Sequence, residues 1–317
     1  MPSDAGAVNS DVSIESRIHH DFLTQMQSSR FNGVLKLRWK YVLRTLAASS
    51  TAKRPRVCSD KEELTEVAQD DTTLSILRAL RKVSDVPLRG LELRHARITA
   101  SHIGCSEKEE KATDREIKQK KTTAPTLYSY FSLGKFASLH TLDLECNKLG
   151  DDGVTYLSQW CLPQLKFLHS LFLASNGFGM TGMESIVQYV ERYHMCDAVS
   201  NVTATNSGLH GLETVGLSNN AICVNKESTE LIFRLLLACR RVLRRLHMNH
   251  VHMSTASSVS LLELVTSLSE EQLLKFPHLQ TIYIKQNEIN KDEFRSIQKR
   301  ISAVSPAAAA AAQAFLV

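Results

Sequence analysis

The densest group of residues that could perform chemistry is a histidine- and methionine-rich segment near residue 250. His247, His250 and His252 alternate with Met248 and Met253, and imidazole and thioether groups are ligands that soft metal ions accept. A metal site, however, needs several side chains that converge on one point. Strand alternation directs Met248 inward and His247 outward, and it leaves the other two histidines on the following turn. The sequence therefore predicts no metal and no cofactor.

The carboxylate pair Asp151 and Asp152 has the residue types of a general acid and base. Both residues stand where a helix is expected to begin, and carboxylates there satisfy free backbone N–H groups. The chain also lacks a Gly-rich phosphate loop and the motifs GxSxG and HExxH. We therefore expect a capping role for this pair and no enzyme activity.

Bulk features of the chain indicate an intracellular protein. The seven cysteines form no CxxC pair, which favours reduced, buried thiols in the cytoplasm, with the nucleus as the alternative. The first residues are polar rather than a secretory signal, and no apolar run reaches membrane-spanning length. The net charge of +5 permits acidic partners but does not require nucleic acid.

Six segments share the spacing LxxLxLxxNxL. The strands and turns that this spacing predicts position the histidine, methionine and aspartate residues named above. The clearest contains Leu142 and Leu144, two residues apart and so on one face of a short strand, followed by Asn147 at the turn. Three further clean copies and two degenerate ones, with Ala96 and Val251 in the Asn position, begin at Leu168, Leu212, Leu279, Leu88 and Leu243. One unit cannot bury its own apolar face, so the copies must stack.

The segment NKLGDDGVTYLSQW, residues 147–160, resembles the ribonuclease-inhibitor type of leucine-rich repeat. Repeat starts at Leu139 and Leu168 agree with the period of about 29 residues in that family. The resemblance implies a right-handed α/β solenoid with six parallel strands on the concave side, helices outside, and a role as a protein-interaction scaffold. Some relatives with this repeat type activate small GTPases. That role is an alternative here, although none of their functional residues matches this chain.

The rest of the chain is organised around the repeats. We expect a disordered tail over 1–16, a helical cap over 17–85 with a polar linker at 48–59, repeats over 86–303, and an Ala-rich tail over 304–317. Within the cap, 17–47 looks helical with a break at Asn32-Gly33, and an amphipathic partner-binding helix is the alternative. Polar insertions are expected near 104–126 and 194–208. The basic linker residues Lys53–Arg56 resemble a nuclear-import signal, and the lysines of the first insertion leave an RNA- or ribonucleoprotein-associated role as a further alternative.

Strand alternation also predicts which side chains face outward on the concave sheet. That face should be acidic at its first two strands, apolar and small in the middle, and basic at the last two. We expect a protein or peptide to lie across it, with its basic part near Asp143 and Glu145 and with Phe172 and Tyr283 as aromatic anchors. A merely solvated sheet is the alternative. The predicted partner-binding residues are Glu92, Arg94, Asp143, Glu145, Phe172, Arg245, His247, Tyr283 and Lys285.

Overall fold

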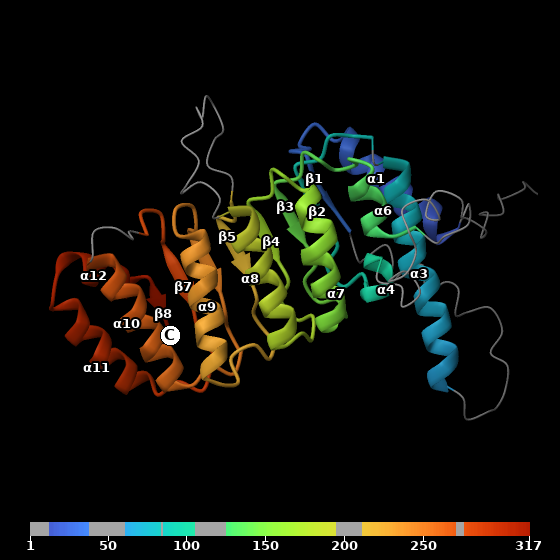
Figure 1. Ribbon diagram of the computed structural model, residues 1–317. Helices are drawn as coiled ribbons and strands as arrows, with labels where there is room; N and C mark the ends of the chain where they lie inside the picture. The colour runs from blue at the N-terminus through green and yellow to red at the C-terminus, as the bar shows by residue number, and fades with distance from the viewer. Residues whose placement is uncertain (1–12, 38–60, 84, 105–124, 195–210, 271–275) are drawn as a thin grey trace, which may run out of the picture.

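The strands form one parallel sheet in which sequence neighbours are also spatial neighbours. The computed structural model describes residues 13–37, 61–83, 85–104, 125–194, 211–270 and 276–317. Its sheet has eight strands in the order β1 to β8 (Figure 1). The strands are β1 (Val34–Lys36), β2 (Gly90–Glu92), β3 (Thr141–Asp143), β4 (Ser170–Phe172), β5 (Thr214–Gly216), β6 (Arg245–His247), β7 (Thr281–Tyr283) and β8 (Phe315–Leu316). This unclosed arrangement confirms the predicted curved α/β solenoid.

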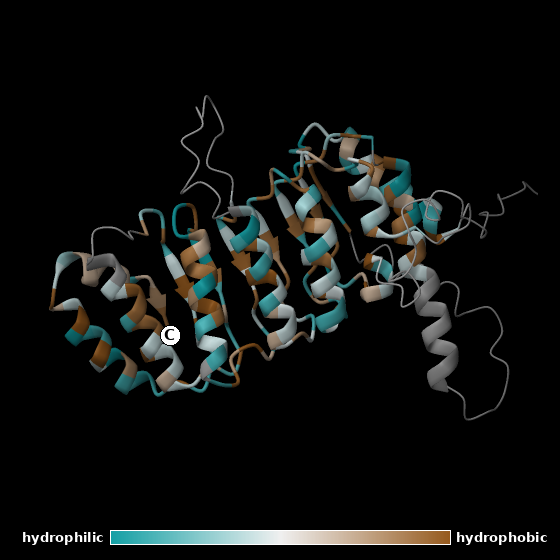
Figure 2. Ribbon diagram, in the orientation of Figure 1, coloured by the Kyte–Doolittle hydropathy of each residue, from teal (hydrophilic) through white to brown (hydrophobic). Residues whose placement is uncertain are grey.

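Helices connect the strands and pack beside one another along one side of the sheet (Figure 1). They are α1 (Ile14–Gln27), α3 (Lys61–Val83), α4 (Ala100–Ile103), α6 (Leu127–Ser132), α7 (Gly150–Tyr156), α8 (Met180–His194), α9 (Lys226–Cys239), α10 (Thr255–Glu270), α11 (Lys291–Ser302) and α12 (Pro306–Gln313). A π-helix (Leu157–Cys161) and a 3-10 helix (Leu162–Gln164) extend α7. Figure 2 shows mixed hydrophilic and hydrophobic residues on these helices, as expected for helices that cover a sheet with one face only.

The core lies between the sheet and the helices, because one residue of each strand, the middle one in β1 to β7 and Phe315 in β8, points toward the helices. These residues stand in lateral register across the sheet. None is more than 2% exposed: Leu35, Leu91, Leu142, Leu171, Val215, Leu246, Ile282 and Phe315. Stacking therefore buries the apolar face that a single repeat would leave in water.

Asparagines join consecutive repeats at the turn that follows each clean strand. The Asn147 amide donates to the carbonyl of Leu144 (2.8 Å) and to that of Leu93 in the preceding repeat (3.0 Å). Its Oδ1 accepts from the Ile98 amide at 2.9 Å. Asn176, Asn220 and Asn287 donate to the same pair of positions, one in their own repeat and one in the repeat before. This confirms the predicted turn role.

The residue before each of these turn positions has a left-handed backbone. Its φ lies between 54° and 58° in His95, Cys146, Ser175, Asn219, His250 and Gln286. A side chain in this conformation costs about 1 kcal/mol or more. Hydrogen bonds from the following turn residue therefore help to hold a strained corner in each clean repeat.

The sheet corrects the predicted six strands to eight. Residues 34–36, expected to be helical, form β1, since α1 ends at Gln27 and Gly33 then turns the chain with a φ of 85°. The Ala-rich tail forms α12 and then β8, which pairs with β7 and buries Phe315. β1 is as long as β2 to β7, but Asn32 and Lys40 stand where the repeat spacing has Leu and Asn, so that spacing did not reveal it. β8 has only two residues, too few for alternation to appear.

The N-terminal residues differ from the prediction in one further way. Residues 13–16, expected to be disordered, begin α1, and Ser13 caps this helix by accepting from the Ser16 amide at 3.2 Å. The helix packs against α3 and β1, and a role of the whole segment 17–85 as a cap stays a prediction. Residues 1–12, the linker 48–59 with its basic residues, and most of the two insertions lie outside the described residues.

Candidate functional site

The sheet face opposite the helices carries the predicted binding residues in rows. Because the register is unshifted, the last residues of β1 to β7 and Leu316 of β8 stand side by side across the whole sheet. We call this set the central row: Lys36, Glu92, Asp143, Phe172, Gly216, His247, Tyr283 and Leu316. Arg94, Glu145 and Lys285 lie two residues further along their chains, and Arg245 stands two residues before His247. Every predicted binding residue thus lies on this one face.

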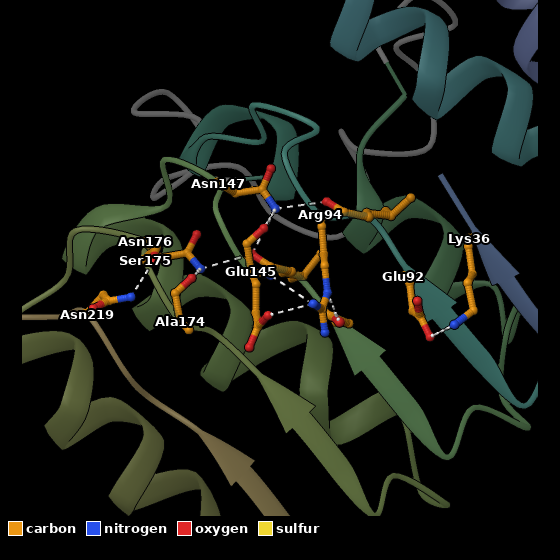
Figure 3. Close-up of polar contacts among 12 residues, drawn as sticks. Lys36, Glu92, Arg94, Glu145, Asn147, Ala174, Ser175, Asn176 and Asn219 are labelled. Carbon is orange, nitrogen blue, oxygen red and sulfur yellow. Dashed lines mark hydrogen bonds and ion pairs between the residues drawn. The ribbon is translucent and has the colours of Figure 1, made fainter. Parts of the chain in front are cut away.

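The charged side chains at the first strands of the central row form ion pairs within the protein. The Nε of Arg94 donates to Oδ2 of Asp143 at 2.5 Å, and its Nη1 lies 3.2 Å from Oε2 of Glu145 (Figure 3). Next to this cluster, Nζ of Lys36 lies 2.8 Å from Oε1 of Glu92. Each of the three carboxylates therefore has a cationic partner on the same face.

Asp143 is not the exposed contact that the sequence predicted. Its side chain is only 2% exposed because the Arg94 side chain covers it. Burial raises the pKa of Asp143, and the Glu145 amide and Arg94 offset only part of that effect. Burial, followed by the charge of Asp143, also raises the pKa of Glu145. Docking of a basic part of the partner at these two carboxylates therefore stays a prediction, and it would have to occur beside Arg94, which already pairs with both.

The other half of the central row is aromatic and apolar. The rings of His247 and Tyr283 stack with centroids 4.5 Å apart and planes 24° from parallel. Phe172 meets His247 edge-on at 6.5 Å, reaching across β5, where the row contains only Gly216. A Cβ at Gly216 would lie 2.8 Å from Cδ1 of Phe172, so glycine is what allows this arrangement. Leu316, 40% exposed, continues the row onto β8.

The electrostatics of His247 suit this apolar surface. Burial, followed by the positive charge of Arg245, lowers the pKa of His247. The imidazole is therefore uncharged at neutral pH and can stack on Tyr283 without bringing an unpaired charge into the row. As expected from alternation, Met248 is buried on the opposite side.

The neighbouring histidines do not form a metal site with His247. His250 Nδ1 lies 3.1 Å from Oδ1 of Asn219, and His252 Nδ1 lies 3.4 Å from Oε1 of Glu288. Both contacts are on exposed turns beyond the strand. Among the described residues, no group of three or more His, Cys, Asp or Glu side chains is arranged to hold a metal ion.

Asp151 caps a helix, as the sequence predicted, but the helix belongs to the next repeat. Its Oδ1 accepts from the Gly179 and Gly182 amides, both at 2.8 Å, at the start of α8. Asp152 is exposed. Asp151 therefore contributes to repeat stacking.

The basic residues at the end of the face differ from the acidic ones in having no charge partner. Arg245 and Lys285 are exposed, and no ion pair among the described residues involves either. Sequence reasoning missed Lys36 and Leu316 because the strands that hold them were missed. The role of Gly216 was also missed, although a glycine that stands between Phe172 and His247 on the outward face could have indicated it.

Comparison with known proteins agrees with the geometry. Residues 137–158, which contain the clearest repeat, match the family model described as a leucine-rich repeat. No curated protein matches the chain. None of the described helices is long and apolar enough to cross a membrane. The match covers one leucine-rich repeat, and the eight-stranded parallel sheet with its helices is consistent with a curved α/β solenoid of such repeats.

Proposed function

We propose that this protein is a non-enzymatic interaction scaffold whose protein or peptide partner lies across the concave face over β4 to β8. Solenoids of this kind present extended concave surfaces for binding. The observation that carries the proposal is the aromatic part of the central row, where Phe172, His247 and Tyr283 are half-buried and mutually packed. Rigid aromatic side chains that expose part of their surface are the residue type most often found at interface hot spots.

The charges of the face support a partner that is apolar over the central row and acidic beyond it. Glu92, Asp143 and Glu145 are paired with Lys36 and Arg94. Among the predicted binding residues, Arg245 and Lys285 carry charges that form no ion pair within the described part of the chain, so a partner can meet them without breaking one. Complementarity of this kind sets orientation more than it sets affinity.

We also propose that the repeats are of the ribonuclease-inhibitor-like type. β3 begins at residue 141 and β4 at residue 170, a separation of 29 residues, and a full helical segment connects the two strands. Long repeats with a helix after each strand are typical of that type.

A reducing compartment, which we propose to be the cytoplasm, fits the thiols. Cys161, Cys223 and Cys239 are free and buried. Burial raises the pKa of Cys223 and of Cys239 to about 12, so these thiols are protonated and unreactive. Imaging of the tagged chain tests the compartment.

The binding proposal is tested with Phe172→Asp combined with Tyr283→Asp in the full chain. A matched control is Phe167→Asp with Tyr193→Asp, which replaces two aromatic residues that are 47% and 46% exposed and lie off the central row. Partners are captured on immobilised protein and identified by mass spectrometry. The proposal predicts that the central-row variant loses a partner that the control retains, with both variants folded by circular dichroism. Retention of every partner by the central-row variant overturns it.

A further inference from the structure

A groove lies beside the end of the central row, between α11 and the last residues of the chain. Its volume is about 710 Å³, within the range of sites that hold ligands of drug or peptide-fragment size. The residues that matter for its chemistry are Lys285, Arg295, Lys299, Leu316 and Val317. Neither Arg295 nor Lys299 belongs to the concave-face binding site proposed above.

The walls of the groove are held in place by hydrogen bonds. Gln298, on the same face of α11 as Arg295 and Lys299, donates from Nε2 to the carbonyl of Ala312 at 2.7 Å. On the opposite wall, the Ile284 amide donates to the Leu316 carbonyl at 2.9 Å. Phe315 anchors this wall by packing on Phe294 in the core, with ring centroids 6.3 Å apart. The groove is therefore a formed feature of the fold.

The groove carries positive charge that the described part of the chain does not neutralise. Lys285, Arg295 and Lys299 line it, and no Asp or Glu does. The nearby acids Asp292 and Glu293 lie in the first turn of α11, outside the lining. No ion pair within the described ranges involves the three bases. Arg295 and Lys299 are also one helical turn apart, where like charges repel, so an anion between them relieves that repulsion.

The apolar residues of the lining indicate which class of anionic ligand the groove fits. Leu316 belongs both to the groove and to the central row, so the two surfaces are continuous. A partner segment that crosses β6 and β7 on the concave face therefore reaches the groove at β8, the next strand. The one aromatic residue in the lining, Phe315, is 2% exposed, so it offers no surface on which a nucleic-acid base could stack.

We propose that this groove binds an acidic peptide segment of the partner, with carboxylates on Lys285, Arg295 and Lys299 and an apolar side chain on Leu316 and Val317. The assignment rests on the proposed function, since it places one end of the partner that lies on the concave face. It adds the chemical class of that end and the direction in which the partner runs, with the acidic segment beyond β7.

The test measures fluorescence anisotropy of a labelled octapeptide of six glutamates and two leucines added to the full chain. The site variant is Lys285→Gln, Arg295→Gln and Lys299→Gln. The control variant is Lys148→Gln, Lys166→Gln and Arg241→Gln, which removes the same charge from exposed residues outside the groove. Because the net charge of both variants is equal, a difference between them reports position rather than general attraction. We expect the site variant to bind the peptide at least about tenfold more weakly than the control.

Three results overturn the assignment: no binding of the peptide to the native chain, equal binding by the two variants, or tighter binding of a uridine octanucleotide that the site variant loses. The third result assigns the groove to nucleic acid. Failure here is separable from failure of the proposed function. If the peptide distinguishes the variants while Phe172→Asp with Tyr283→Asp keeps every partner, the groove stands as a site for acidic peptides, and both the concave-face proposal and the direction of the partner fall. If the peptide does not distinguish them while that double variant loses its partner, the reverse holds.

Discussion

Arg94 provides a quantitative test of how the concave face is held together. Replacing it with Gln removes the cation that covers Asp143, whose carboxylate then keeps only its bond from the Glu145 amide at 3.0 Å. Breaking a buried ion pair costs about 3–5 kcal/mol. Arg94 itself is 50% exposed, so water replaces part of its interaction. We expect Arg94→Gln to lower the free energy of unfolding by about 1–3 kcal/mol, measured by urea denaturation.

The raised pKa of Asp143 also predicts how the stability loss caused by Arg94→Gln changes with pH. Burial raises the pKa of Asp143, so the folded state binds its proton more tightly than the unfolded chain does. The stability linked to that proton is fully present below the unfolded pKa of about 3.9 and is lost as pH rises through the folded value. Removing Arg94 raises the folded pKa further. The loss caused by Arg94→Gln should therefore be largest at neutral pH and fade as pH falls through the folded pKa of Asp143, before pH reaches about 4.

A double-mutant cycle separates the charge effect from packing. In an Asp143→Asn background Arg94 keeps only its ion pair with Glu145, whose side chain is 20% exposed, so Arg94→Gln should cost less than about 1 kcal/mol. Lys36→Gln is the exposed control, since its ion pair with Glu92 has a 55% exposed lysine and should be worth about 0–1 kcal/mol. If Arg94→Gln costs as much in the Asp143→Asn background as in the native one, Arg94 stabilises the sheet through packing and our reasoning is refuted.

The remaining predictions concern the turn, the row and its histidine. Asn147→Ala should lower the free energy of unfolding by about 1–3 kcal/mol, because the Leu93 and Ile98 groups that it bonds are buried; a variant that melts like the parent contradicts the turn role. Gly216→Val should displace the Phe172 ring and weaken partner capture, while circular dichroism stays unchanged. An unaltered capture level would mean that the ring position is irrelevant. The pKa of His247 is lowered in the folded state, so the neutral imidazole contributes to the free energy of unfolding. That contribution is present above the unfolded pKa of about 6.5 and is lost as pH falls through the folded value. His247→Asn should therefore reduce the loss of stability between pH 7.5 and pH 5.5, as measured by thermal unfolding, and an identical loss in both proteins argues against this shift.

Features that depend on residues close in sequence were predictable. The Leu142 and Leu144 pair and Asn147 lie within one short segment, and the two bonds that the turn amide donates repeat in the four copies that have Asn. The same local logic placed Met248 inside and His247 outside. Outward positions on six strands could accordingly be assigned without a structure.

Features that depend on lateral neighbours could not be predicted. Arg94 and Asp143 are 49 residues apart, and nothing in either segment shows that one covers the other. Phe172 reaches His247 only because an intervening strand places Gly216 between them. The alanines before Phe315 favour helix and gave no sign of the strand that follows. The groove formed with that strand was therefore not predictable either, because Arg295 and Lys299 look like ordinary exposed residues of a helix.

The location of the partner is the central claim, and site-specific photo-crosslinking tests it most directly. A benzophenone amino acid is placed at Arg245, exposed on the concave face, and separately at Gln188, exposed on α8 on the opposite side of the sheet. Crosslinked proteins are identified by mass spectrometry after irradiation in extract. We predict that the partner lost by Phe172→Asp with Tyr283→Asp crosslinks from position 245 and not from position 188. Crosslinking of that partner from position 188 alone would contradict concave-face binding.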